Sequence, residues 1–368
     1  MSAKSVLAQP MTIGGLTIKN RFVRSATAER LAKKDGSIDE KMVDLYRTLA
    51  EGGTGLIITG HSFVRLDGKA NARMSGIDTD DKIPQWRKVT DAVHVADAKI
   101  AIQINHAGRQ TTEATIGEQP KAPSPVPMEA TGTTPRELTH DEILGIIAAY
   151  GQAARRAKEA GFDAIQLHGA HGYLISQFNS PYLNCRTDEW GGSPEKRMRF
   201  VLAVYDAVRK AVGEGFPIFI KINCQDCVEG GLEPAESSRI AAALVAKGLC
   251  AVEISGGTGD VWNEIIRTDV LPGKNEAYFE PHVKPFREAV NVPLMLVGGM
   301  RSPSVMQRIV ADGVADFVSL CRPLIREPDL PAKILAGRTE PAKCISCNKC
   351  FATRACIQEK RASDAKQP

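Results

Sequence analysis

Three side chains that can donate or deliver protons lie within six residues of one another: His168, His171 and Tyr173, with two glycines between them. They follow a short apolar run, Ala164–Leu167, of the kind that forms a buried strand. Two imidazoles can donate hydrogen bonds to an oxyanion or enolate, and a phenol can hand over a proton. A single histidine is most often a packed core residue. Three such groups at one strand end instead predict a catalytic site.

Eight short apolar runs, separated by helix-like segments, must position these groups. The runs lie at 22–23, 55–59, 100–104, 164–167, 218–222, 251–254, 293–297 and 317–320, and we expect helices over 39–51, 84–98, 140–160, 194–212, 234–247, 281–289 and 303–311 and from residue 329. Strands too apolar to show alternation are typical of a parallel sheet covered on both faces. Eight strand–helix units predict an α/β fold, a (β/α)8 TIM barrel, rather than a doubly wound sheet, which needs fewer strands. The sequence MTIGGLTI (11–18) predicts an N-terminal β-hairpin.

The carboxyl ends of barrel strands carry the active site, so the residues directly after each run are the candidates. These are 24–27, 60–61, 103–106, 168–173, 221–223, 255–259, 298–301 and 321–322. Glycine-rich turns after the sixth and seventh runs and an arginine after the eighth match the phosphate site of such barrels. The motifs of Rossmann sites, P-loops, zincins and nucleophile elbows are all missing from the sequence. We therefore expect a phosphate-bearing cofactor at the barrel mouth.

Composition narrows the class of protein further. The net charge is only +4, from 47 basic and 43 acidic residues without a basic stripe, so we expect no nucleic-acid partner. No run of eighteen apolar residues predicts a membrane span, and the N-terminus lacks the apolar core of a signal peptide. Nine cysteines, four of them clustered near the C-terminus, do not resemble a secreted disulfide framework. We expect a cytoplasmic homo-oligomer.

Taken together, these motifs resemble the Old Yellow Enzyme family of NADH:flavin oxidoreductases. The matching stretches are NRFVRSAT (20–27), GLIITGH (55–61), IQINHAGRQ (102–110), APSPV (122–126), HGAHGYL (168–174), SPYLNCRTDEWGGSPEKRMRF (180–200), GGM (298–300) and CRPLIREP (321–328), which span nearly the whole chain. The resemblance implies FMN as cofactor and NAD(P)H as co-substrate. It implies reduction of a small-molecule activated alkene, such as an enone, enal or enoyl ester.

Carried over position by position, the resemblance implies a role for each candidate. The flavin-binding residues would be Ser25, Ala26, Thr27, Ala28 and Gly60 against the ring, Gln103 at its pyrimidine edge, Lys221 beside N1 and O2, and Gly299, Cys321 and Arg322 at the phosphate. His168 and His171 would donate to the substrate carbonyl while a hydride moves from flavin N5 to the β-carbon. Tyr173 would then protonate the α-carbon.

Two positions near the predicted flavin depart from the family pattern or are unusual. Many members place a hydroxyl or thiol where this chain has Ala28, so we expect the flavin potential to be tuned differently. Arg24 either offsets negative charge near the cofactor, meets an acidic substrate, or pairs with Glu29.

Four cysteines near the C-terminus have the spacing of metal ligands: Cys344, Cys347, Cys350 and Cys356. Four thiolates can hold an iron–sulfur cluster or zinc, and free thiols are the remaining alternative. CISCN (344–348) resembles the context of the [4Fe–4S] cluster in dienoyl-CoA reductase and trimethylamine dehydrogenase, where the fourth cysteine lies further downstream and a nucleotide-binding domain follows. The present sequence stops at residue 368, so we expect a cluster to need a separate partner. We divide the chain into a barrel (1–338) and a Cys-rich tail (339–368).

Two alternatives to an FMN-dependent ene-reductase stay open. The first is a flavin and iron–sulfur subunit of a dienoyl-CoA reductase-like system that passes electrons to a partner protein. The second is a flavin-free lyase or isomerase in which Lys221 forms a Schiff base and Tyr173 is the acid. The second explains neither Gln103 nor the two histidines, which favours a flavin enzyme.

Overall fold

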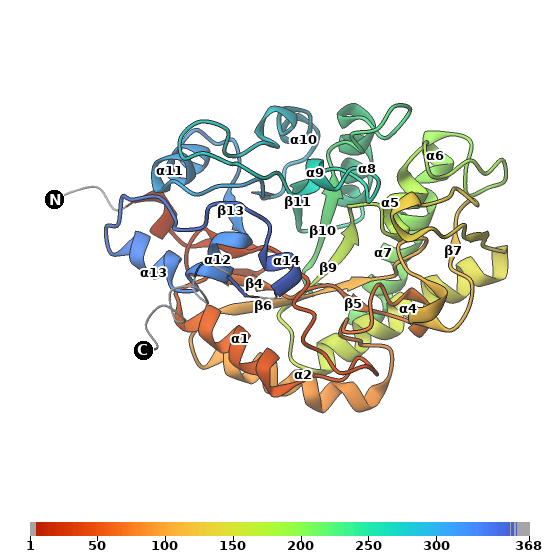
Figure 1. Ribbon diagram of the computed structural model, residues 1–368, viewed down its shortest axis with the longest axis horizontal. Helices are drawn as coiled ribbons and strands as arrows, with labels where there is room; N and C mark the ends of the chain where they lie inside the picture. Colours follow the sequence, from red (N-terminus) through yellow and green to blue (C-terminus); the bar gives the residue numbers. More distant parts are fainter. Residues whose placement is uncertain (1–4, 354, 357, 359–368) are drawn as a thin grey trace.

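Eight parallel strands close into a barrel in the computed structural model, which describes residues 5–353, 355–356 and 358 (Figure 1). The strands are β3 (Phe22–Arg24), β4 (Leu56–Ile58), β6 (Lys99–Asn105), β9 (Ala164–Gly169), β10 (Ile218–Asn223), β11 (Ala251–Ser255), β12 (Leu294–Leu296) and β13 (Phe317–Leu320). The sheet closes because β3 pairs with both β13 and β4, and β4 pairs in turn with β6. Each predicted apolar run overlaps one strand, so the (β/α)8 barrel is confirmed.

The main helices surround the barrel, and each follows one of its strands (Figure 1). They are α1 (Glu40–Glu51), α2 (Ile83–His94), α4 (His140–Glu159), α7 (Arg199–Val212), α8 (Pro234–Ala246), α10 (Lys284–Ala289), α11 (Pro303–Ala311) and α13 (Leu330–Leu335). Local capping fixes several starts: Thr139 and Glu142 form a capping box at α4. The predicted helix over 194–212 is two helices, because a turn at Met198 separates α6 (Pro194–Arg197) from α7.

The predicted N-terminal hairpin closes the amino end of the barrel. Strands β1 (Met11–Ile13) and β2 (Leu16–Ile18) are antiparallel and turn through two glycines with positive φ. Ile13 and Ile18 are fully buried against apolar side chains that point into the barrel from every strand: Val23, Leu56, Ile58, Ala101, Ala164, Phe219, Ala251, Met295 and Phe317. This apolar plug leaves only the carboxyl end of the barrel open to ligands.

Two residues further along four strands, the barrel interior becomes polar. Gln103, Gln166, Lys221 and Glu253 are almost completely buried and form one connected layer. Gln103 Nε2 donates to Gln166 Oε1 (2.7 Å), Gln166 Nε2 donates to Glu253 Oε2 (2.8 Å), and Lys221 Nζ lies 3.3 Å from the same carboxylate oxygen. The expectation that the strands would show no alternation is therefore wrong for these interior positions. Their connection satisfies groups that would be costly to bury alone.

The segment that follows residue 338 packs against the barrel. Ala342 N–H donates to the Arg301 carbonyl (2.9 Å), and Asn348 Oδ1 accepts a hydrogen bond from Arg322 (2.6 Å). Residues 354, 357 and 359–368 of the predicted tail lie outside the described residues, and the division at residue 338 stays a prediction. Among the helices in the described part of the chain, none combines the length and the apolar character needed to cross a membrane.

Candidate active site

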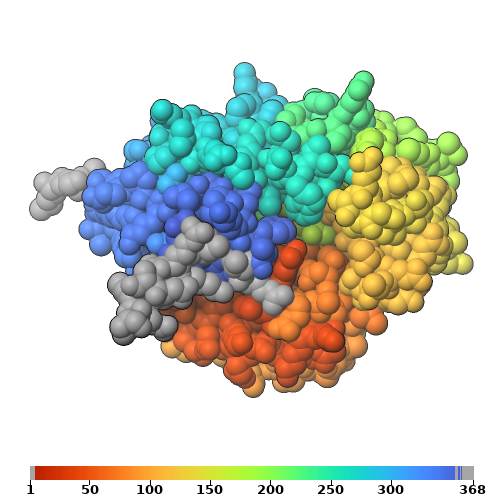
Figure 2. Space-filling model, viewed as in Figure 1, coloured from red at the N-terminus to blue at the C-terminus, as the bar shows by residue number. Residues whose placement is uncertain are grey.

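A cavity of about 380 Å³ opens at the carboxyl end of the barrel strands. In Figure 2 a hollow lies near the centre of this face, bordered by atoms coloured red-orange, yellow and teal. All the predicted catalytic and flavin-binding residues except Gly60 line the cavity: Ser25, Ala26, Thr27, Ala28, Gln103, His168, His171, Tyr173, Lys221, Gly299, Cys321 and Arg322. Its volume falls in the range of small-molecule sites. The structure thus brings together groups that are spread over some 300 residues of sequence.

The two histidines and the tyrosine lie on one side of this cavity. The ring centroid of His168 is 5.3 Å from that of His171 and 4.8 Å from that of Tyr173. His171 has a left-handed backbone (φ 64°), its N–H donates to Asn223 Oδ1 (2.9 Å), and its Nε2 lies 2.7 Å from Ser255 Oγ. This turn places all three rings at the mouth. The small residues Gly169, Ala170 and Gly172 separate them in the sequence.

Burial sets the protonation states of these three groups. Burial, reinforced by nearby His171, His61 and Lys221, holds the pKa of His168 well below 6.5, and burial with Lys221 and His61 does the same for the pKa of His171. Burial raises the pKa of Tyr173 to about 12, although the positive charge of Arg30 opposes the shift. Near neutral pH both imidazoles are therefore neutral, with one N–H each to donate, and the phenol retains its proton.

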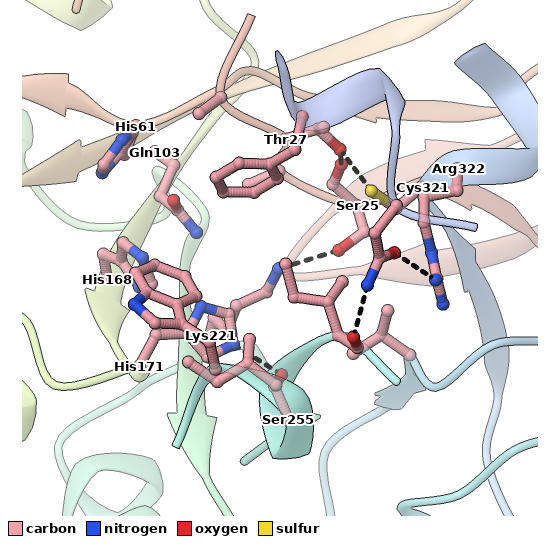
Figure 3. Close-up of a pocket in the computed structure, with 18 of the residues that line it drawn as sticks. Ser25, Thr27, His61, Gln103, His168, His171, Lys221, Ser255, Cys321 and Arg322 are labelled. Atoms are coloured by element: carbon pink, nitrogen blue, oxygen red, sulfur yellow. Dashed lines mark hydrogen bonds between the residues drawn. The ribbon is translucent and has the colours of Figure 1, made fainter. Parts of the chain in front are cut away.

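The cofactor-binding candidates occupy the rest of the cavity wall. Figure 3 shows Cys321 and Arg322 on the side opposite His168 and His171, with Lys221 and Ser25 between them. Lys221 Nζ donates to Ser25 Oγ (2.7 Å), and Arg322 Nη1 donates to Asn348 Oδ1.

The two cations of this wall stand apart. Lys221 could neutralise an anionic flavin ring and Arg322 a terminal phosphate. The cavity wall also carries apolar side chains such as Val297, Met300 and Leu320. Both the size of the cavity and its donor set therefore fit FMN.

Two positions singled out from the sequence lie behind the cavity wall. Gly60 does not line the cavity: a Cβ there would collide with the Glu29 carboxylate and stand 2.6 Å from the Thr27 carbonyl oxygen. Arg24 does not line it either, because its guanidinium donates to the backbone carbonyls of Ser25, Ile58 and Thr27. Arg24 thus supports the loop that carries Ser25 to Thr27, and the expectation that it meets an acidic substrate is wrong.

Arg30, His61, Gln110 and Ser255 are among the lining residues that had no assigned role in the sequence analysis. The ring of His61 packs edge-on against both Tyr173 (4.9 Å) and His168 (5.7 Å). Gln110 is 7 % exposed, and within the described residues neither of its amide atoms has a hydrogen-bond partner. His61 lies three residues after β4 and Ser255 ends β11, and both fall in the strand-end stretches 60–61 and 255–259 that the sequence analysis named without giving these two residues a role. Arg30 and Gln110 lie in loops and offer no such signal.

The four tail cysteines line a second, smaller cavity of about 20 Å³, and Arg322 lines both cavities. In the part of the chain that the structure describes, however, no three His, Cys, Asp or Glu side chains are arranged to hold a metal ion. The residues as placed do not form a finished ligand set, and the metal site at Cys344, Cys347, Cys350 and Cys356 stays a prediction.

Comparison with known proteins identifies the family. The chain matches the NADH:flavin oxidoreductase / NADH oxidase family over residues 6–340. It is 43% identical over 341 residues to an NADH oxidase of Thermoanaerobacter brockii, covering 91% of this chain and 52% of that protein. It is 38% identical over 329 residues to an NADPH dehydrogenase of Geobacillus sp. (strain WCH70), covering 89% and 93%.

A solved structure of 2-naphthoyl-CoA reductase with 2-naphthoyl-CoA matches with a TM-score of 0.90 at 28% identity, covering 99% of this chain and 58% of that one. The chain spans about half the length of the NADH oxidase and almost all of the NADPH dehydrogenase. The match over residues 6–340 includes every strand of the barrel and every residue proposed for the main cavity up to Arg322. This chain belongs to the NADH:flavin oxidoreductase / NADH oxidase family.

Proposed function

We propose that this protein is an FMN-dependent NAD(P)H oxidoreductase that reduces alkenes activated by a carbonyl group. One observation carries the proposal: His168, His171 and Tyr173 line the same cavity as Lys221, and Arg322 lies on the side opposite the two histidines. FMN bound in that cavity would supply the hydride chemistry, with NAD(P)H as the source of electrons. The nicotinamide-linked oxidoreductase names of the two similar proteins support this assignment.

His168 and His171 polarise the alkene. As neutral imidazoles they donate N–H groups to the carbonyl oxygen of the substrate and share the negative charge that develops there when the β-carbon receives hydride. Because His168 is buried, the two rings pack edge-on against each other, and His171 is also hydrogen bonded to Ser255, little reorganisation is needed during the reaction.

Tyr173 completes the reduction by protonating the α-carbon. A phenol with a pKa of about 12 keeps its proton at neutral pH and can still give it to an enolate carbon. Lys221 and Arg322 bind the anionic groups of the cofactor. Ser25 and Glu253 hold Lys221 in place, and Asn348 holds Arg322.

The test is the absorption spectrum of the purified protein, recorded without oxygen and after reconstitution with FMN. We expect a two-banded flavin spectrum that bleaches with NADH or NADPH and returns when 2-cyclohexen-1-one is added. Tyr173→Phe is the matched variant, because it keeps the ring and removes only the hydroxyl. Protein that stays colourless and binds no FMN would overturn the proposal.

The tail supports a second candidate, a flavin and iron–sulfur subunit that passes electrons to a partner. It rests on the four cysteines that line one cavity and on Arg322, which lines both that cavity and the main one. Iron and sulfide analysis of protein purified without oxygen distinguishes the two candidates: iron near four atoms per chain favours the second, and its absence the first. The flavin-free lyase is disfavoured, because Lys221 Nζ is held by Ser25 and lies 3.3 Å from the Glu253 carboxylate, where it is not free to attack a carbonyl.

A further inference from the structure

The main cavity is lined by cations and by no carboxylate. Among the described residues its wall carries Arg30, Lys221 and Arg322, and neither aspartate nor glutamate. A cavity of one charge sign concentrates ligands of the opposite sign. The proposed cofactor is itself anionic and would bind some of these cations, and any cation that it leaves free can bind an anionic group of the substrate.

Two of the three cations lie on the cofactor side and already have partners. Lys221 is bound by Ser25 and Glu253, and Arg322 donates to Asn348 and to the carbonyl of Arg267 (2.7 Å). The flavin ring and its phosphate account for these two positions in the proposed function. Lys221 and Arg322 are therefore both occupied by the cofactor, and neither can also bind a group of the substrate.

Arg30 differs from both. Its guanidinium lies over the ring of Phe351, 4.9 Å from the centroid, and within the described residues no hydrogen bond or ion pair of its side chain is found. Arg30 lines the cavity together with His61 and Tyr173, whose rings pack against each other on the side of the two catalytic histidines, and its positive charge lowers the pKa of both. The residue also adopts a left-handed backbone (φ 54°), which is uncommon for a side chain of this size.

We propose that Arg30 binds an anionic group, a carboxylate or a phosphate, carried by the alkene substrate away from its reacting double bond. The inference rests on the proposed function and names the class of its substrate. A guanidinium presents paired N–H donors that match the oxygens of either anion, and the Phe351 ring holds its plane without neutralising its charge. The histidines then bind the activating carbonyl while Arg30 binds the remote anion.

The experiment uses phenols, which carry an oxygen for the two histidines and whose binding perturbs the absorption of the bound flavin. FMN-loaded protein is titrated with 3-(4-hydroxyphenyl)propionate, with its neutral amide, and with 4-hydroxyphenyl phosphate, at low and high salt. A charge-assisted hydrogen bond predicts that an anionic probe binds about 10-fold or more tightly than the amide, with a preference that weakens as salt increases. Which anion binds more tightly identifies carboxylate or phosphate as the substrate group.

Arg30→Gln should bring the ratio of anion to amide dissociation constants to near one, and Arg30→Lys should restore part of it. Arg267→Gln is the matched control. Arg267 also lies 4.9 Å over an aromatic ring, that of Tyr278, but it is paired with Glu264 and does not line the cavity, so its variant should keep the full ratio.

Equal binding of anion and amide by the unaltered protein would overturn the inference and leave the proposed function intact. A preference that survives Arg30→Gln would do the same. If no phenol perturbs the flavin, the proposed function fails and this inference fails with it.

Discussion

The buried histidines make a strong prediction about acid stability. His61 and His168 are buried and His171 is partly buried beside them, and burial is the largest cause of the lowered pKa of each, to about 4 for His61 and well below 6.5 for the other two. Below pH 6.5 the unfolded chain therefore takes up protons that the folded protein does not. Stability is fully present above pH 6.5 and is lost as the pH falls toward the folded values.

The size of the loss follows from this difference. Each histidine that is protonated only in the unfolded chain costs about 1.4 kcal/mol by pH 5.5 and about 2 kcal/mol by pH 5. Three such histidines cost about 6 kcal/mol at pH 5, which is comparable to the whole stability of many domains. We therefore expect these three groups to lower the unfolding free energy of the cofactor-free protein by several kcal/mol as the pH falls from 7.5 to 5, on the order of the sum above.

The assay is urea unfolding followed by circular dichroism between pH 7.5 and 5, on the unaltered protein and on His168→Asn/His171→Asn. The double variant should lose about 4 kcal/mol less over this range. Buried Glu29 and Asp226, whose raised pKa values act in the opposite direction, are present in both proteins and cancel in the difference. Equal pH dependence of the two unfolding free energies would refute the reasoning.

Three further predictions concern single side chains. Tyr173→Phe should slow alkene reduction about 100-fold or more in stopped-flow measurements, because that half-reaction needs the proton of Tyr173. Flavin reduction by NAD(P)H needs no such proton and should be unchanged. Glu253→Leu leaves the Lys221 ammonium buried without a carboxylate and should cost about 3–5 kcal/mol in chemical denaturation. Asn348→Ala removes a hydrogen bond to Arg322 and should weaken FMN binding about 10-fold in a flavin fluorescence titration.

Each of these predictions has an outcome that contradicts it. Equal slowing of both half-reactions by Tyr173→Phe would remove the proton-donor role. A loss below about 1 kcal/mol for Glu253→Leu would show that Lys221 finds another partner. For Asn348→Ala, an unchanged FMN dissociation constant would mean that Arg322 does not depend on the tail. Lys343→Ala is a suitable control for that variant, since within the described residues the hydrogen bond of Lys343 to the barrel comes from its backbone N–H, which the substitution keeps.

Arg24 illustrates how much could be read from the sequence. Val23 belongs to the barrel interior and Ser25 contacts Lys221, so the alternation of β3 turns Arg24 outward, toward the ring of Tyr46 in α1. This direction was available from the two-residue period of the strand. Nearness in sequence to the flavin-binding residues is the weaker guide here, because neighbouring residues of a strand point to opposite faces.

The sequence by itself determined the barrel and the chemistry of its best candidates. Apolar runs, helix caps and the Gly14–Gly15 turn are local signals, because they depend on neighbours within a few residues. The group His168, His171 and Tyr173 could be recognised for the same reason, because its members lie within six residues at the carboxyl end of one strand, β9.

Only the tertiary structure decided which distant groups meet. Lys221 bonds to Ser25 across 196 residues of sequence, and its carboxylate partner Glu253 comes from the next strand. Arg30 lies in a loop without periodicity, and nothing local distinguishes it from the other arginines of the chain. Its place in the cavity and its lack of a counterion among the described residues follow from barrel closure, which brings the first, fifth and last strands to one mouth.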